Sequence, residues 1–227
     1  MEANPILLKV GWTVLRLGDL KLFSTSTAWL NDDSINFYYE YLTQNKETKD
    51  VLLVSASTGA LMVYEDIEEL KDILAGLEFP SFKYWLIPVN DKKDPTSTGG
   101  MHWSLLCYDG ENFYHLDSIG RSGNYSNAKI IIEKVSKLYL KDQPVKVIME
   151  IDYARQENSY DCGMYVITAS ESILDNVLAG KGDALKELKE QLTPKYIKKK
   201  RQELYALFVS MLKEQNKEAL KLLKPPK

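Results

Sequence analysis

The chain has 227 residues, of which 44% are hydrophobic and 27% are charged, and its formal net charge is −3. This composition excludes a disordered chain and is typical of a soluble domain with a hydrophobic core. No stretch approaches the ~18 consecutive apolar residues that span a membrane, and the first ten residues lack the basic segment and apolar run of a signal peptide, so we expect neither a membrane segment nor secretion.

The first third of the chain predicts helices joined by short extended segments. Turns near Gly11 and Gly18 divide the first thirty residues into extended pieces. Asn31 or Asp32 can cap a helix, and the residues that follow have the spacing of a half-buried helix face: Ile35, Tyr38, Tyr39 and Leu42. A short strand is expected at 51–55, and an amphipathic helix is marked by Ile67, Leu70, Leu74 and Leu77.

The middle of the chain predicts a hairpin beside a buried strand. Residues 102–108 and 112–117 are strand-like runs on either side of Asp109 and Gly110. An Asp-Gly pair between two such runs is a strong hairpin signal. The buried strand is expected at 83–89.

The remaining elements complete an α+β pattern. In chain order they are a helix at 127–140, a strand at 145–149, a helix at 162–174 and a helical C-terminal segment at about 193–224. Thr193 followed by Pro194 is a favoured helix start. We therefore expect one domain over residues 1–227, with a central, mostly antiparallel sheet flanked by helices.

Two features of the sequence bear on location and partners. The basic run at 198–201 lies in an amphipathic pattern, which favours a solvated helix face over nucleic-acid binding or a nuclear signal. The chain has two cysteines: Cys107 lies in an apolar strand, and Cys162 lies in a polar turn. A disulfide framework is not indicated, so we expect a reducing compartment, cytoplasmic or nuclear.

Cys162 is the candidate nucleophile. If a helix begins there, its thiol lies at the positive end of the helix dipole. That position, together with a nearby imidazolium, favours a reactive thiolate. Gly163 would let a substrate carbonyl approach the backbone closely. The alternative is a buried structural cysteine at the end of a loop.

The hairpin predicts which of the two histidines acts as a base. A two-residue turn would place His102 opposite Asp117, and a four-residue turn would shift the pairing by two but keep both on one face. Asp117 would then accept from one ring nitrogen, and the other would face the thiol. His115 shares this face, opposite Ser104 under the two-residue register, and lacks an acidic partner. We expect it to be a packed or hydrogen-bonded histidine.

An oxyanion in this site would need hydrogen-bond donors. The backbone N–H of Cys162 is one candidate, and the side-chain amide of Gln156, six residues earlier, is another. The two histidines and two cysteines do not have the spacing of zinc ligands. We therefore predict neither a metal nor an organic cofactor.

Three motifs occur in a recognisable order: GGMHWS at 99–104, FYHLDS at 113–118 and QENSYDCG at 156–163. This order resembles the sentrin/SUMO-specific protease family, which acts on ubiquitin-like modifiers. The likeness extends to WLND at 29–32 and LTPKYI at 192–197, and so covers nearly the whole chain. The run that begins NSYDCG, together with the short length, is most similar to the deneddylase members.

The resemblance implies a papain-like cysteine protease fold and a role for each matching residue. Cys162 matches the nucleophile, His102 the general base and Asp117 the residue that orients it. Gln156 matches the oxyanion donor. The alternative for Gln156, taken alone, is a solvated loop residue.

The resemblance also implies a binding site for the C-terminal tail of the modifier. Trp103 matches the tryptophan that roofs a tunnel for the terminal Gly-Gly, and Trp29 and Asp32 match residues that grip the tail. Without the resemblance, Trp29 would be read as a core tryptophan. Gly100 is also expected to bind the tail. Together with Gly99 it follows the polar loop at 90–98 and suits a hinge that closes on substrate.

The implied activity is cleavage after the Gly-Gly of the neddylation modifier, from precursors and from conjugates such as cullins, by a monomeric enzyme. A second hypothesis changes the modifier to SUMO or ubiquitin. A third is an acyltransferase, against which the Trp103 tunnel argues. A fourth is a non-catalytic module that binds a modifier, against which the complete set of catalytic residues argues.

Overall fold

A five-stranded sheet forms the centre of the computed structural model, which describes residues 4–92, 100–120, 123–140, 146–148 and 153–223. Its strands, in spatial order, are β3 (Val51–Leu53), β4 (Tyr84–Asn90), β5 (Trp103–Tyr108), β6 (Asn112–Leu116) and β7 (Lys146–Ile148). The three central strands are antiparallel, and the short edge strands β3 and β7 join them in parallel.

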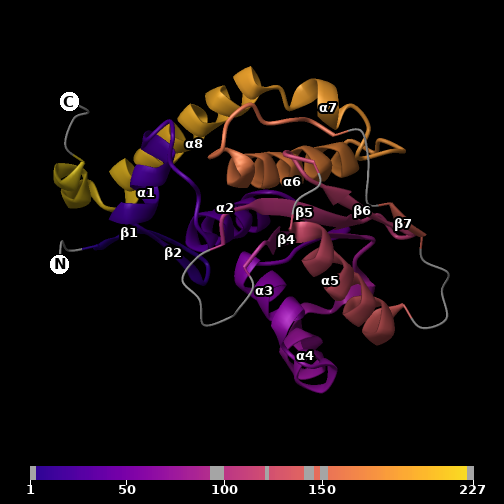
Figure 1. Ribbon diagram of the computed structural model, residues 1–227. Helices are drawn as coiled ribbons and strands as arrows, with labels where there is room; N and C mark the ends of the chain where they lie inside the picture. The colour runs from indigo at the N-terminus through magenta and orange to yellow at the C-terminus, as the bar shows by residue number, and fades with distance from the viewer. Residues whose placement is uncertain (1–3, 93–99, 121–122, 141–145, 149–152, 224–227) are drawn as a thin grey trace.

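Helices cover both faces of this sheet (Figure 1). They are α1 (Leu17–Ser24), α2 (Asp32–Asn45), α3 (Ala56–Tyr64), α4 (Ile67–Leu74), α5 (Asn124–Tyr139), α6 (Cys162–Leu178), α7 (Leu188–Gln191) and α8 (Pro194–Gln215). Short 3₁₀ helices in the described part of the chain lie at Ala75–Leu77, Phe79–Ser81 and Lys217–Leu222. Helix α6 lies on one face of the sheet, and α3, α4 and α5 lie on the other. The predicted α+β class is confirmed.

The two faces explain why the central strands are almost uniformly apolar. Along β5, Leu105 and Cys107 belong to the core under α6, whereas Leu106 and Tyr108 belong to the core under α5. Successive side chains of a strand point to opposite faces, so a strand buried on both sides needs apolar residues at every position.

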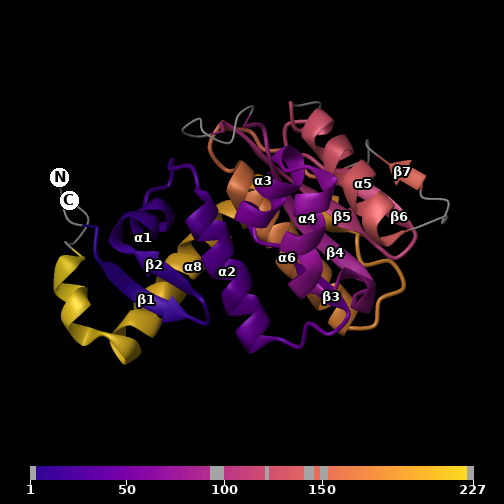
Figure 2. The same cartoon turned by 90° about the horizontal axis from the view of Figure 1, so that it is seen from below.

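A second, two-stranded sheet lies at the other end of the molecule, where β1 (Ile6–Val10) pairs with β2 (Thr13–Arg16). Figure 2 shows this hairpin beside α1 and α8. The sequence predicted extended pieces here but missed α1. Gly18, expected in a turn, lies inside that helix, whose start is fixed because the Asp19 carboxylate accepts from the Arg16 N–H at 2.9 Å. Helix α3 was also missed.

The predicted helix starts are confirmed at three positions. The Asn31 side chain accepts from the Ser34 N–H at 2.9 Å and caps α2. Thr193 caps α8 with Pro194 as its first residue, and α6 begins at Cys162. None of the helices in the described ranges is long and apolar enough to cross a membrane.

The hairpin between β5 and β6 has a four-residue turn, so the two-residue turn is wrong. Tyr108 pairs with Phe113, not with Glu111. The Asp109 carboxylate accepts from the N–H groups of Glu111 and Asn112 at 2.9 and 2.7 Å, and this cap stabilises the wider turn. The register shifts by two residues, which leaves the same side chains on the same face.

Candidate active site

His102 and Asp117 meet at the open end of the β5–β6 hairpin. The ring Nε2 of His102 lies 2.8 Å from the Asp117 carboxylate, and both side chains are buried. The same carboxylate oxygen accepts from the Ile119 N–H at 3.0 Å. Because the carboxylate is held by the backbone, it fixes the ring and leaves Nδ1 as the free nitrogen. The predicted His–Asp couple is confirmed as geometry.

Cys162 is the first residue of α6 and is buried. Burial of the His102 ring opposes its protonation, but hydrogen bonds and charge interactions with Asp117 and Cys162 outweigh burial and raise the pKa of His102 to about 9. The interaction with Cys162 places its thiol beside the ring. The structure therefore brings the sulfur, the imidazole and the carboxylate together.

The imidazole of His102 should keep its proton up to about pH 9. A Cys162→Ala variant removes one of the interactions that stabilise the charged ring, so the pKa of His102 should fall. Nuclear magnetic resonance titration of the ring protons measures this directly. An unchanged pKa of His102 in the variant would contradict the contact between thiol and ring.

His115 behaves in the opposite way and provides the control for this titration. Its Nε2 lies 2.8 Å from the hydroxyl of Ser104, and burial lowers the pKa of His115 to about 4, an effect that Asp117 only partly offsets. A His115→Gln variant should remove only the signal that titrates near this value. The prediction that His115 is a hydrogen-bonded histidine is confirmed, although its paired residue across the hairpin is Leu106.

Gln156 is held beside the couple by two hydrogen bonds. Its side-chain oxygen accepts from the Ser118 hydroxyl at 2.6 Å, and its amide nitrogen donates to the Asn158 carbonyl at 2.5 Å. A primary amide has two N–H donors, so one remains for an oxyanion. The backbone N–H of Gln156 also donates to the Ser118 carbonyl at 2.9 Å, which fastens this loop to the end of β6.

Trp103 is fixed across the start of α6. Its indole N–H donates to the Leu30 carbonyl at 3.0 Å. A side chain at Gly163 would begin 2.9 Å from the Leu30 Cβ and 3.5 Å from the Trp103 ring. Gly163 is therefore required for the packing of α6 against these two residues, which differs from the substrate approach expected from the sequence.

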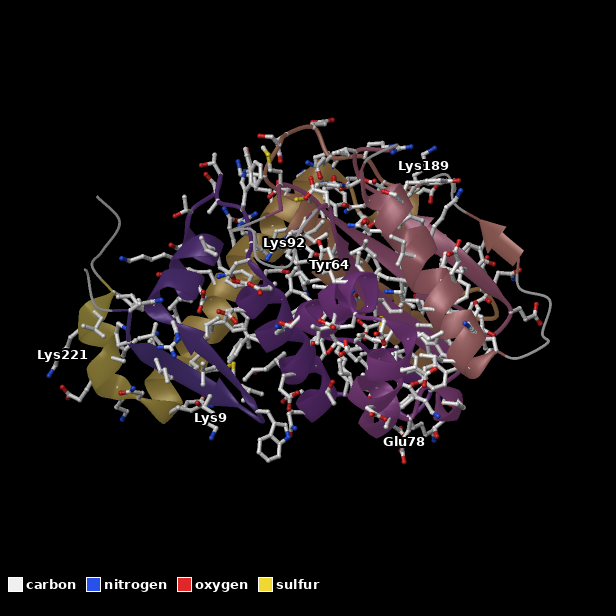
Figure 3. The ribbon with its side chains drawn as sticks, turned by 60° about the horizontal axis from the view of Figure 1, so that its bottom comes forward. Lys9, Tyr64, Glu78, Lys92, Lys189 and Lys221 are labelled. Atoms are coloured by element: carbon white, nitrogen blue, oxygen red, sulfur yellow. The ribbon has the colours of Figure 1, made fainter. Side chains whose placement is uncertain are left out.

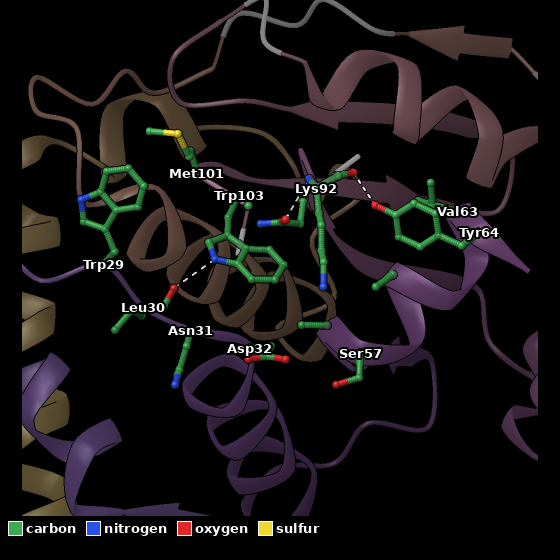
Figure 4. Close-up of a pocket in the computed structure, with 14 residues that line it drawn as sticks. Trp29, Leu30, Asn31, Asp32, Ser57, Val63, Tyr64, Lys92, Met101 and Trp103 are labelled. Atoms are coloured by element: carbon green, nitrogen blue, oxygen red, sulfur yellow. Dashed lines mark hydrogen bonds between the residues drawn. The ribbon is translucent and has the colours of Figure 1, made fainter. Parts of the chain in front are cut away.

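Trp103 also lines a cavity of about 330 Å³. Trp29, Asp32 and Gly100 all line it, as Figure 4 shows for the first two. Trp29 is 38% exposed, so it is not a core residue. The structure thus gathers the four residues predicted to bind the tail around one cavity, and one of them, Trp103, also lies against the start of α6.

One wall of this cavity is formed by α3, a helix that was not predicted from the sequence. Ala56, Ser57, Ala60, Val63 and Tyr64 line it from that helix. Tyr64 donates its hydroxyl to the Lys92 carbonyl, and Figure 3 shows the two residues side by side. The signal for α3 was Ser55, which accepts from the Thr58 N–H as a helix cap.

Gly100 packs closely against Asn90 at the end of β4. A side chain there would begin 1.7 Å from the Asn90 carboxamide oxygen. Gly99 and most of the predicted 90–98 loop lie outside the described residues, so the hinge stays a prediction. The described residues contain no cluster of His, Cys, Asp and Glu that could hold a metal ion. The absence of a cofactor also stays a prediction.

Comparisons with known proteins agree on one family. The model of the Ulp1 protease family, C-terminal catalytic domain, matches residues 28–212. Sentrin-specific protease 8 of Homo sapiens is 33% identical over 217 residues, which cover 93% of this chain and 100% of that protein. NEDD8-specific protease 1 of Arabidopsis thaliana is 28% identical over 209 residues, which cover 88% and 91%.

A solved structure shows the same fold. The C-terminal Ulp1 protease domain in complex with Smt3, the yeast ortholog of SUMO, superposes with a TM-score of 0.66. Its sequence is 17% identical, and the match covers 93% of this chain and 90% of that one. At this identity the likeness establishes the arrangement of helices and strands.

Proposed function

The chain belongs to the Ulp1 protease family of cysteine peptidases, and from this premise we propose that it cleaves after the C-terminal Gly-Gly of a ubiquitin-like modifier of the neddylation type. The observation that carries this proposal is the position of Trp103, whose indole lines the cavity beside Trp29 and Asp32 and also lies against the start of α6. A chain that passes beneath a fixed indole to reach Cys162 must lack side chains. Glycine meets that condition.

The proposed reaction is an acyl transfer through a thioester. The Cys162 sulfur attacks the carbonyl carbon of the last glycine, and the negative charge that develops on its oxygen is stabilised by the N–H of Cys162 and the amide of Gln156. His102 then gives its proton to the departing amine, which is a lysine side chain or the first residue of a propeptide. Water, deprotonated by His102, releases the modifier from the sulfur and regenerates the thiol.

The name of one relative supports NEDD8 as the modifier, because NEDD8-specific protease 1 of Arabidopsis thaliana matches most of this chain. NEDD8-conjugated proteins, such as cullins, are the substrates that we propose, and we propose that the enzyme acts as a monomer.

A labelling panel tests the function. The protein is mixed with NEDD8, SUMO and ubiquitin that each carry an electrophile at the C-terminus, and adducts are read by intact mass. We expect an adduct with the NEDD8 probe alone, absent from a Cys162→Ala variant. An adduct with SUMO or ubiquitin instead would keep the chemistry and overturn the modifier. No adduct with any probe would favour an acyltransferase or a non-catalytic binding module.

A Gln156→Ala variant should lower kcat by about 10²–10³-fold, because loss of one oxyanion donor removes stabilisation that exists only in the transition state. Turnover of a NEDD8 fusion measures this. A Gln44→Ala variant is the matched control, since that amide donates to Glu40 at 3.1 Å on the surface. Equal kcat values in the two variants would exclude Gln156 as the oxyanion donor.

A further inference from the structure

The residue before Cys162 is tied to the C-terminal helix by a buried ion pair. The Asp161 carboxylate oxygen Oδ1 lies 2.8 Å from Nη2 of Arg201, which is 40 residues away in the chain. Arg201 is 3% exposed and Asp161 is 6% exposed. The other terminal nitrogen of Arg201 donates to the Leu22 carbonyl in α1 at 2.8 Å. One guanidinium therefore joins α8, α1 and the start of α6.

The same ion pair continues towards the oxyanion donor. The second oxygen of Asp161 accepts from the Asn158 side-chain amide at 2.8 Å. The Asn158 side-chain oxygen accepts in turn from the backbone N–H groups of Tyr160 and Asp161 at 3.1 and 3.0 Å. The Asn158 carbonyl accepts from Gln156. Arg201 is thus the outer end of a connected series of contacts that reaches both Cys162 and Gln156.

Because Asp161 is charged, its contact with Arg201 has an electrostatic effect on Cys162 as well as a structural one. A buried carboxylate next to Cys162 would oppose formation of the thiolate if it were unpaired, because charges interact strongly where water is excluded. The other charged groups near this site in the described part of the chain are His102 with Asp117, at the end of the sheet, and Glu157, in the loop before α6. Arg155 is also nearby, and its guanidinium donates to the Asp117 carbonyl at 3.0 Å rather than to Asp161. Arg201 supplies the positive charge that offsets Asp161.

We propose that Arg201 is a positioning residue for the reaction: it holds Asp161 and neutralises its charge, and thereby sets both the geometry and the reactivity of Cys162. This inference rests on the proposed roles of Cys162 and Gln156. It places part of the active site on α8, a helix that supplies none of the described residues that line the cavity beside Trp103.

The test is the pH dependence of Cys162 alkylation by iodoacetamide, read by intact mass. In Arg201→Met, the unpaired carboxylate of Asp161 should shift the low-pH side of the alkylation rate profile to higher pH by about one unit. In Asp161→Asn the unopposed guanidinium should move it to lower pH. A residue that merely supports the fold would not give shifts of opposite sign.

Lys200→Met is the matched control. Lys200 precedes Arg201 on α8 and also forms an ion pair with α6, through Glu171, but at a point nine residues beyond Cys162. We expect its alkylation profile to match that of the wild type. A Cys162→Ala variant gives the background from the buried Cys107.

A profile for Arg201→Met equal to that of the wild type would overturn the proposal. If this variant does not fold, Asp161→Asn decides, because an unchanged or upward-shifted profile contradicts the charge argument. Failure of the proposed function is distinguishable, since alkylation requires no modifier. A protein that shows the opposite shifts but reacts with none of the modifier probes would keep Arg201 in its role and refute the substrate.

Discussion

An Asp117→Asn variant should cleave a NEDD8 fusion with kcat lowered by about 10³–10⁴-fold and with KM little changed. The carboxylate accepts from His102 and from the Ile119 N–H, and it helps to raise the pKa of the ring. An amide in its place can offer its N–H₂ group to the ring and thereby favour the wrong tautomer. The fold should persist because the volume is conserved.

The matched control for this variant is Asp109→Asn at the opposite end of the same hairpin. Asp109 likewise accepts two hydrogen bonds, here from the backbone N–H groups of Glu111 and Asn112, but it lies at the turn. Its kcat should remain within about twofold of the wild type, because the turn is remote from the couple and surface changes have small effects. Steady-state kinetics compares the two. A loss of less than tenfold in Asp117→Asn would contradict the role of this carboxylate.

A Phe208→Ala variant should lower the free energy of unfolding by about 3–5 kcal/mol. Phe208 on α8 is fully buried, and its ring meets those of Phe23 and Phe37 edge-on at centroid distances of 5.0 and 5.3 Å. These three rings join α8 to α1 and α2. Truncation would leave a cavity at the junction that the surrounding helices cannot fill.

Chemical denaturation followed by fluorescence and circular dichroism measures this loss, with Phe82→Ala as the control, because Phe82 is only partly buried, against the core on the other side of the sheet. A smaller loss is expected there. The two probes should report one common transition in every variant, as a single domain over residues 1–227 requires. Separate transitions for the two ends of the chain would contradict that prediction.

The sequence predicted the His–Asp couple because the argument did not depend on the turn. Alternation along two strands keeps His102 and Asp117 on one face for a turn of two or four residues. The turn itself was not predictable from the Asp-Gly pair, since the Asp109 carboxylate selects the wider turn through two local hydrogen bonds. Predicting which residues pair across the hairpin requires the side-chain hydrogen bonds of the turn. Predicting which face of the sheet a side chain lies on requires only the alternation along each strand.

Contacts between distant segments were beyond the reach of sequence patterns. Arg201 was read as one residue of a solvated basic run, and its burial against Asp161 depends on how α8 packs over α6 and α1. Helix α1 has only eight residues and contains a glycine, so it has too few turns for a periodic signal. Its stability comes from tertiary contacts rather than from helix propensity.

The fixed indole of Trp103 also sets a rule for inhibitor design. A compound that fills the cavity beside Trp29 and Asp32 contacts Trp103 but not Cys162, which is not among the residues that line this cavity. To react with Cys162 it needs a linker that is flat and unbranched, no wider than a diglycine unit, ending in a small warhead such as a nitrile or an aldehyde. Bulky electrophiles that modify open thiol sites should leave this enzyme untouched, which gives chemists a route to selectivity based on thickness rather than on reactivity.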